Sequence, residues 1–415
     1  MPLIVSLGMG LGIKDTSYLI SSSLIISGVA TLIQINRIGP IGSGLLSIQG
    51  TSFTFIGPLI YSYIILKDGY SPQEALGIIM GCCAACAFCM IVLGQFIHKL
   101  QHAITTNVSG ATVILIGVSL VWTTFINLQR DYNQISESGE NAWWVFVLAA
   151  LVLGITFLLS RSKQPLLRIS SVTIGLIIGF ILAWVLGLVN FTPLQNLEFF
   201  FLPHPGYFPF GFDIKIFFIL LPIFIISATE AVGDLSATAK LSGLPLGNRA
   251  YWERIRGGVS GDALNSFIAA VFSTFPNTSF SQNNGVIRLT GVCSRYVGIY
   301  TACMLIVLGV FPIVGGIFII MPGSVLYGAT ALMFFLVFLS GLNIVESGAV
   351  EVKSWPLVGV AVVVGIAASF ITPHLEFLPK WLATLLQFPI STGAIVAMLM
   401  EVFRPKKILG SRQPA

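Results

Sequence analysis

Two short polar stretches decide the fold of this chain: Gln49-Gly50-Thr51-Ser52-Phe53-Thr54-Phe55 and Pro276-Asn277-Thr278-Ser279-Phe280-Ser281-Gln282. Both contain Thr-Ser-Phe followed by Thr or Ser, and both are β-prone and edged by Gly or Pro within apolar surroundings. A four-residue near-match also arises by chance in 415 residues. The shared setting favours an internal repeat, because many transporters break one helix at matching places in two inverted halves.

Irregular backbone inside a membrane persists only where protein or a water-filled cavity satisfies its N–H and C=O groups. We therefore interpret the two stretches as parts of a binding site for a polar ligand, together with the positive N-terminal ends of the half-helices that follow them.

The repeat also predicts where the chain should begin. Its two serines lie 279 − 52 = 227 positions apart, so a second half that opens near Ile214 places the opening of the first half at 214 − 227 = −13. We expect about a dozen residues to be missing at the front, with Pro2–Ile13 as the end of a truncated first segment. The alternative is a first half that is shorter.

The composition predicts an all-α polytopic membrane protein. Only 9% of the residues are charged, 55% are hydrophobic and the mean hydropathy is +0.93, which excludes a soluble enzyme, a disordered chain and a small disulfide scaffold. The apolar runs are too long for a β-barrel. Candidate segments lie near 18–35, 44–66, 75–97, 108–128, 143–160, 169–190, 214–238, 262–275, 280–292, 296–320, 325–345, 356–372 and 380–402.

The charges predict an orientation. The net charge is +5. If the C-terminal tail is cytoplasmic, its four Lys and Arg join eleven in loops on the same side, against five outside; Arg288 is ambiguous. This excess fits the positive-inside rule. We therefore predict that the chain lies in a lipid bilayer. No basic stripe with interleaved aromatic residues occurs, so we predict that it does not bind nucleic acid.

Three acids lie within apolar segments: Glu230, Asp234 and Asp262. A charged acid at the centre of a bilayer costs at least about 2.5 kcal/mol, so such residues usually serve function. Glu230 and Asp234 are four residues apart and share a helix face, which suits the uptake and release of protons. The alternatives are a structural role for Glu230, a cap or a pairing with a loop cation for Asp234, and a helix N-cap for Asp262.

The sequence contains no recognisable catalytic or metal motif. The cysteines within Gly81–Cys89 have C-x-x-C spacing, but no nearby His or acid completes a zinc site, and small residues packing between helices explain them better. A Walker A sequence, a G-x-S-x-G elbow and an H-E-x-x-H pair are missing. The four histidines, at 98, 102, 204 and 374, fall in or near loops. We predict a protein that is not an enzyme and needs no metal or cofactor.

One stretch resembles a known signature. Gln282–Gly291 reads QNNGVIRLTG and matches all five specified positions of Q/E/P-N-x-G-x-x-x-x-T-R/K/G, the signature of the nucleobase–ascorbate transporter family (nucleobase:cation symporters). Thr229–Asp234 and Gly257–Asp262 also resemble bacterial xanthine and uric acid permeases. The spacing agrees, with 32 residues from Glu230 to Asp262 and 20 from Asp262 to Gln282.

The resemblance implies a fold of fourteen segments in two inverted sevens, with short antiparallel strands in segments 3 and 10. It implies a core domain that carries the site and a gate domain against which the core moves in an elevator-type mechanism. It also implies a homodimer. The implied parts are 1–107 (core), 108–190 (gate), 191–324 (core), 325–402 (gate) and 403–415 (cytoplasmic tail).

The resemblance also implies a substrate-binding set, namely Glu230, Gln282, Phe53, Ser281, Asn283 and Ser52. In it, Glu230 is the binding acid of segment 8, Gln282 reads the edge of the base, and Phe53 meets the base through its backbone. Asp262 matches the essential acid of segment 9 and Asp234 a polar position one turn from Glu230. We expect these two and Glu230 to serve proton coupling.

The implied function is proton-coupled uptake of a purine, xanthine and/or uric acid, across a bacterial inner membrane, driven by the proton gradient alone. The alternatives are a permease for uracil or another nucleobase, a sodium–ascorbate carrier, a channel, and a non-transporting or truncated sensor-like homologue. The sequence departs from the family in one respect: the Gln-His pair of segment 1 is missing. Arg288 occupies a free position of the signature and has no assigned role.

Overall fold

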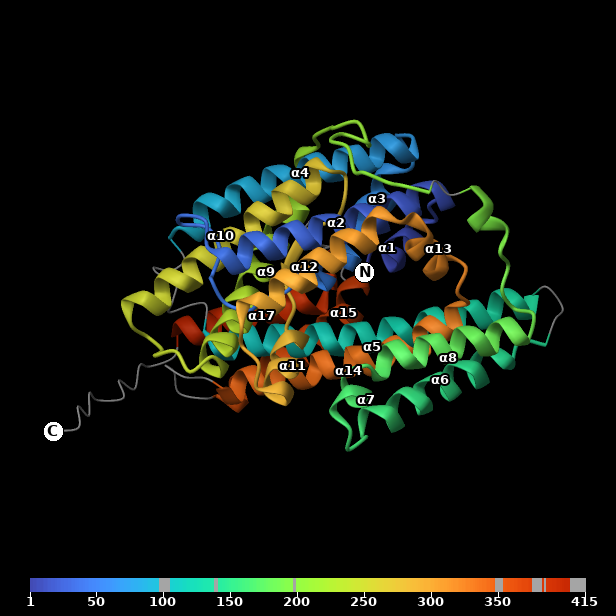
Figure 1. The fold of residues 1–415 in the computed structure, drawn as a ribbon. Helices are drawn as coiled ribbons and strands as arrows, with labels where there is room; N and C mark the ends of the chain where they lie inside the picture. Colours follow the sequence, from blue (N-terminus) through green and yellow to red (C-terminus); the bar gives the residue numbers. More distant parts are fainter. Residues whose placement is uncertain are drawn as a thin grey trace.

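The chain folds almost entirely into helices. The computed structural model describes residues 1–96, 105–137, 141–196, 199–347, 354–374, 383 and 386–403. Figure 1 shows the longer helices lying roughly along one direction. The first half contains α1 (Pro2–Met9), α2 (Ile13–Asn36), η1 (Phe53–Phe55), α3 (Ile56–Leu66), α4 (Pro72–Gly94), α5 (Thr106–Glu137), α6 (Trp144–Ser160), α7 (Pro165–Ile169) and α8 (Ser171–Val185). After η3 (Thr192–Asn196), the second half contains α9 (Ile214–Leu241), α10 (Arg249–Val271), α11 (Gln282–Thr290), α12 (Arg295–Val310), α13 (Pro312–Ile319), α14 (Gly323–Ser347), α15 (Trp355–Ile371), η4 (Thr372–His374) and α17 (Pro389–Phe403).

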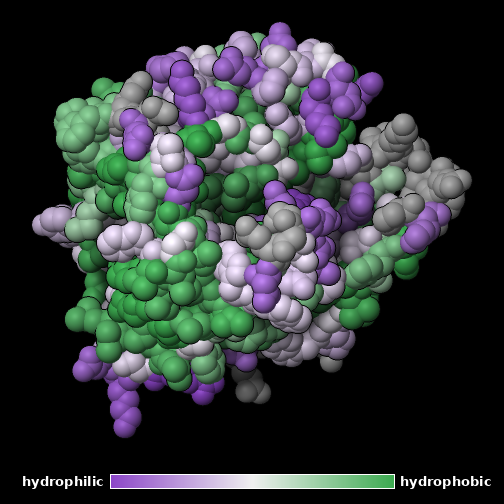
Figure 2. All heavy atoms as spheres, turned by 90° about the vertical axis from the view of Figure 1, so that its right-hand side faces the viewer, coloured by the Kyte–Doolittle hydropathy of each residue, from purple (hydrophilic) through white to green (hydrophobic). Residues whose placement is uncertain are grey.

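The predicted polytopic membrane fold is confirmed. Within the described ranges, α2, α4, α5, α9 and α14 are long and apolar enough to cross a membrane, and α12 with α13 makes a sixth span that bends by 76°. Large apolar side chains remain exposed on several helices. Figure 2 shows hydrophobic residues over much of the left and lower part of one end of the molecule, with hydrophilic residues along its top and around its centre. Exposed apolar faces of this extent need lipid rather than water.

The internal repeat is confirmed, and its two copies bind each other. β1 (Gln49–Thr51) pairs antiparallel with β2 (Asn277–Ser279). The register pairs Gln49 with Ser279, Gly50 with Thr278 and Thr51 with Asn277. Shifting Gly50 forward and Thr278 back by the repeat offset of 227 gives Asn277 and Thr51, which is itself an observed pair. The strand pair therefore lies on the pseudo-two-fold axis of the two halves.

The helices pack in two groups that each draw on both halves. The core group is α1–α4 with α9–α13, and the gate group is α5–α8 with α14, α15 and α17. In Figure 1 the helices α2, α4, α10 and α12 lie above α5, α6, α8 and α14. Glycines bring α5 and α14 into close contact, since a Cβ on Gly117 would lie 2.5 Å from the Phe338 nitrogen and one on Gly341 would lie 2.6 Å from the Ile114 nitrogen.

Three glycines of α10 explain the Gly-Gly-Val-Ser-Gly-Asp stretch. The loop before β1 lies directly on this helix, with the Gly42 N–H donating to the Gly257 carbonyl at 2.7 Å. A Cβ on Gly258 would lie 2.3 Å from the Leu235 side chain, and one on Gly261 would lie 2.2 Å from the Gln34 Oε1. A Cβ on Gly257 would lie 2.5 Å from the Gly42 carbonyl oxygen. Side chains at these positions would therefore push the loop, α9 and α2 away from α10.

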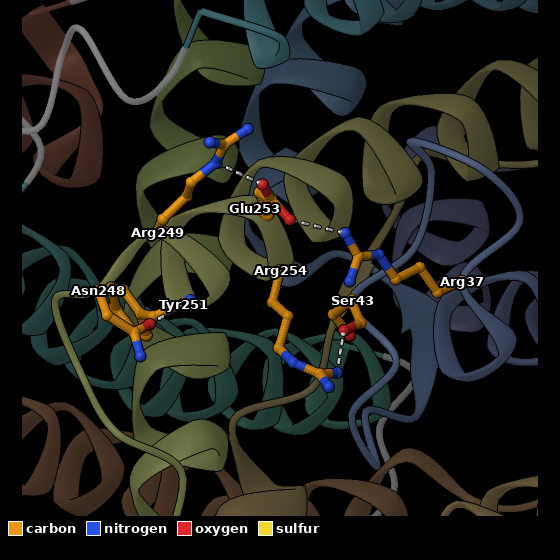
Figure 3. A network of polar contacts seen from close by, with 7 residues as sticks. All are labelled: Arg37, Ser43, Asn248, Arg249, Tyr251, Glu253 and Arg254. Atoms are coloured by element: carbon orange, nitrogen blue, oxygen red, sulfur yellow. Dashed lines mark hydrogen bonds and ion pairs between the residues drawn. The ribbon is translucent and has the colours of Figure 1, made fainter.

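Charged residues hold the same loop at the start of α10 (Figure 3). The Arg254 guanidinium donates to the carbonyl oxygens of Ser43 and Gly44 at 3.0 and 3.4 Å. Glu253 forms ion pairs with Arg37 at 3.5 Å and with Arg249 at 3.1 Å. The side chains therefore fix the beginning and the middle of the loop against one helix.

Two expectations about segments were wrong. The segment near 262–275 belongs to α10, which begins at Arg249 because the Asn248 side chain accepts the Tyr251 N–H at 2.8 Å. Asp262 is therefore in mid-helix and is not an N-cap. The segment near 296–320 breaks at Pro312, which has no N–H to continue α12.

The segment near 44–66 is helical only from η1 onward. His98, His102 and the predicted tail beyond residue 403 lie outside the described residues.

We predict that Gly261→Ala destabilises the protein, because its new methyl group displaces Gln34. Overpacking of this kind costs about 1–3 kcal/mol and should lower the melting temperature of the purified protein in detergent. Gly154→Ala is the matched control, since nothing lies within 4 Å of a Cβ at that helical position. An equal melting temperature for the two variants would contradict the contact.

Candidate functional site

The strand pair brings two helix beginnings and two aromatic rings together. β1 leads into η1 at Phe53, and β2 leads into α11 at Gln282. The rings of Phe53 and Phe280 lie nearly parallel, with centroids 6.0 Å apart, and Phe334 of α14 meets Phe53 edge-on at 5.4 Å. The Phe280 ring lies against β1, because a Cβ on Gly50 would be only 2.2 Å from it. The site therefore has flat apolar walls on a backbone framework.

Glu230 of α9 lies beside this framework. Its side chain is 6% exposed, and its Oε2 accepts a hydrogen bond of 2.9 Å from the Thr54 hydroxyl of η1. The neighbouring Thr229 carbonyl accepts from the Ser109 hydroxyl of α5 at 2.5 Å. Thr54 thus holds the Glu230 carboxylate, and Ser109 ties the backbone beside Glu230 to α5.

Asp262 binds the second strand directly. Its carboxylate accepts from the Ser279 N–H at 3.1 Å, the Ser279 hydroxyl at 3.2 Å and the Thr278 hydroxyl at 3.3 Å. The Gln34 amide of α2 also donates to the Asp262 Oδ1, at 3.2 Å. The Gln49 amide of β1 donates to the Ser279 hydroxyl at 2.9 Å. Charge-assisted bonds of this number fix β2 on α10.

Asp234 differs from the other two acids. It is 1% exposed, and neither carboxylate oxygen has a hydrogen-bond partner in the part of the chain that the structure describes. It lies well inside α9, so it is not a cap, and none of the described cations pairs with it. A buried carboxyl group that gives the fold no bond is costly, so Asp234 is a candidate for a functional role.

The three acids form one electrostatic unit. Glu230 and Asp234 interact with each other, and both interact with Asp262. A change of charge at any one of them is therefore felt at the other two.

The other predicted binding residues have different surroundings. Gln282 is half-buried at the first position of α11, and its side chain makes no hydrogen bond to the described residues. The Ser52 hydroxyl is buried and likewise unpartnered within the described ranges. By contrast, the Asn283 amide donates to the Leu46 carbonyl at 2.7 Å, so it is engaged by the loop before β1. The Ser281 carbonyl accepts from the Ser340 hydroxyl of α14 at 3.3 Å.

Sequence reasoning missed several residues that build the site. Thr54 and Gln49 lie within the first polar stretch, and Gln34 lies in the apolar segment near 18–35. Their polar side chains in apolar surroundings were a signal that could have identified them. Asn284 was less visible: its side chain accepts from the Thr238 hydroxyl at 2.6 Å and donates to the Asp234 carbonyl at 3.2 Å. The network therefore depends on amides and hydroxyls as much as on acids.

Arg288 and two cysteines of α4 acquire structural roles. Arg288 of α11 donates to the Asn343 Oδ1 of α14 at 2.8 Å and so joins the core group to the gate group. The cysteines of α4 pack against the start of α9, where the Cys82 and Cys86 thiols contact the carbonyl oxygens of Asp213 and Phe217 at 3.3 and 3.6 Å.

Comparison with known proteins gives matches over most of the chain. The sequence model of a family described as the Permease family matches residues 1–374. The xanthine permease XanP of Escherichia coli strain K12 is 39% identical, over 98% of this chain and 88% of the relative. The xanthine permease XanQ of the same strain is 35% identical, over 97% of this chain and 87% of the relative.

A solved structure shares the fold. The transmembrane domain of the cyanobacterial bicarbonate transporter BicA has a TM-score of 0.55 at 14% identity, over 97% of this chain and 93% of that one. The inverted-repeat fold is therefore common to proteins of very different sequence.

We predict that two substitutions that neutralise a buried acid differ in their effect on stability. Asp262→Asn replaces an acceptor oxygen by a donor that faces other donors, and should cost about 2 kcal/mol of stability. Asp234→Asn removes no hydrogen bond of the carboxylate and should therefore cost less stability than Asp262→Asn. Melting temperatures of both purified variants test this, and an equally large loss for Asp234→Asn would contradict it.

Proposed function

The chain belongs to the Permease family of nucleobase–ascorbate transporters, and from this premise we propose that it is a proton-coupled symporter of purine bases, with xanthine and uric acid as first candidates. Membership of a permease family points to transport rather than to catalysis. Its apolar helices make it an integral multi-pass membrane protein.

The observation that carries the proposal is the strand pair, which joins Glu230, the two parallel rings and the start of α11 in one buried place. A purine is flat and has donors and acceptors on its edges. The rings of Phe53 and Phe280 suit its faces, and the Glu230 carboxylate accepts from its ring N–H groups. Gln282 supplies both a donor and an acceptor.

A site that demands such bonds rejects ligands that lack them, because its own buried polar groups then go unpaired. A purine is favoured over uracil because position 282 is an amide, where uracil permeases usually carry an acid. The relatives named as xanthine permeases support the same choice.

The interactions between the three acids support the proposed proton coupling. Charge that moves through the bilayer is costly, so a proton taken up at Glu230, Asp234 or Asp262 lowers the cost of moving the loaded site. Asp234 is the preferred carrier, because losing or gaining its proton breaks no hydrogen bond of its carboxylate.

The two helix groups support an elevator-type movement. We assign residues 1–107 and 191–324 to the moving core and residues 108–190 and 325–402 to the gate. The polar side chains of Ser109, Ser340 and Arg288 bridge the groups in the described structure, and these bonds have to break and reform as the core moves. A homodimer that associates through the gate, in a bacterial inner membrane with a cytoplasmic C-terminus, completes the proposal.

The function is tested by uptake of radiolabelled xanthine into cells that express this chain. We expect uptake that a protonophore abolishes and that Glu230→Gln reduces by at least about 100-fold, because the binding acid is lost. Glu346→Gln, an exposed acid at the end of α14, is the matched control. Uptake that persists uphill in Glu230→Gln would contradict the assigned role.

A second prediction isolates one bond. Thr54→Val removes the hydroxyl that donates to Glu230 and should raise the KM for xanthine about five-fold, which corresponds to about 1 kcal/mol. Thr330→Val removes a hydroxyl that bonds only within α14 and should leave the KM unchanged. Equal KM values for the two variants would show that Thr54 does not position the acid.

A further inference from the structure

A cavity lies at the opposite end of α2 from the charged network of Figure 3. Lys14 and Arg37 are separated by almost the whole helix, which at 24 residues is about 36 Å long. The cavity has a volume of about 560 Å³, within the usual range for ligand pockets. The predicted orientation of the chain places it outside. Its lining includes Lys14, Ser17 and Tyr18 of α2, and Phe201, His204 and Tyr207 of the segment before α9.

The aromatic walls of this cavity are fixed in place. The rings of Tyr18 and Tyr207 stack with centroids 3.7 Å apart, and His204 lies 5.3 Å from Tyr207. The Tyr207 hydroxyl donates to Asp15 at 3.0 Å, and the Tyr18 hydroxyl donates to the His204 carbonyl at 3.0 Å. Tyr18 is buried and supports Tyr207 from one side, so Tyr207, His204 and Phe201 present the accessible aromatic surface. Rings held in this way are preformed for contact with another flat molecule.

The lining of the cavity contains one lysine, Lys14. Lys14 is exposed, and its ammonium forms no ion pair with any described residue. The neighbouring carboxylate of Asp15 is outside the lining and already accepts from Tyr207. An aromatic surface beside one available cation is suited to a flat aromatic anion.

We propose that this cavity is an outer capture site for planar aromatic anions, and specifically for urate, the anion of uric acid. The identity of urate as the ligand rests on the proposed function. The cavity lies over the turn that leads into β2, because Tyr18 and Ser22 both donate to the Phe272 carbonyl, at 3.2 and 3.0 Å. The next residue, Ser273, has a positive φ of 54° and accepts the Phe208 N–H at 3.2 Å. A captured anion is therefore held next to the polypeptide that builds the central site.

The test is equilibrium binding of radiolabelled urate to the full chain in detergent, in a Glu230→Gln background that disables the central site. We expect weak saturable binding that Lys14→Glu weakens by about tenfold or more. Lys67→Glu, a lysine at the end of α3 and outside this cavity, should leave binding unchanged. Salicylate, a flat anion that is not a purine, should compete. Equal urate binding by the Lys14→Glu and Lys67→Glu variants, at equal melting temperatures, would overturn the proposal.

Transport separates this proposal from the central site. In otherwise unmodified protein, Lys14→Glu should raise the KM for urate with kcat unchanged, and leave the KM for neutral hypoxanthine unaltered. If no purine is taken up but salicylate binding still depends on Lys14, then the proposed function fails and the anion cavity stands. If Lys14→Glu alters urate and hypoxanthine equally, the cavity does not select anions and the proposal fails.

Discussion

The pairing of β1 with β2 is the constraint on which the rest of the structure depends. Inside a membrane, an extended backbone must find hydrogen-bond partners within the protein. Here each broken segment supplies the partner of the other, and the pseudo-two-fold symmetry makes this possible with a single repeated sequence. Asp262, the glycine face of α10 and Arg254 then hold the pair and its leading loop in place. Phe53, Phe280 and Gln282 are positioned as a consequence.

The three intramembrane acids show how one residue type serves different ends in one site. Asp262 has several partners and stabilises a strand. Glu230 has a single hydroxyl partner beside the two rings, which leaves it able to meet a ligand. Asp234 has no carboxylate partner among the described residues and is the costliest of the three to the fold. We propose that this difference in bonding matches three roles: Asp262 as scaffold, Glu230 as binding acid and Asp234 as proton carrier.

Much of this architecture could be predicted from sequence, and the exceptions have physical reasons. The repeat followed from two polar, β-prone stretches in apolar surroundings, and the membrane class followed from the composition. The two strands followed from the resemblance to the nucleobase–ascorbate transporter family. The start of α10 did not, because an Asn cap outweighs the polar character of its first turns. Thr54 and Asn284 were not identified, since their importance lies in partners 176 and 46 residues away. Asn283 is predicted to bind substrate, yet its amide serves the Leu46 carbonyl, a contact that depends on the loop conformation.

The central claim is that this buried site moves a purine across the membrane, and counter-flow tests it most directly. Purified protein in vesicles preloaded with unlabelled xanthine should transiently concentrate labelled xanthine inside, above the external level, without any ion gradient. Only a carrier whose single site faces each side in turn produces this overshoot. Label that rises no higher than the external level, in vesicles whose protein binds xanthine, would identify a channel or a sensor and contradict the account.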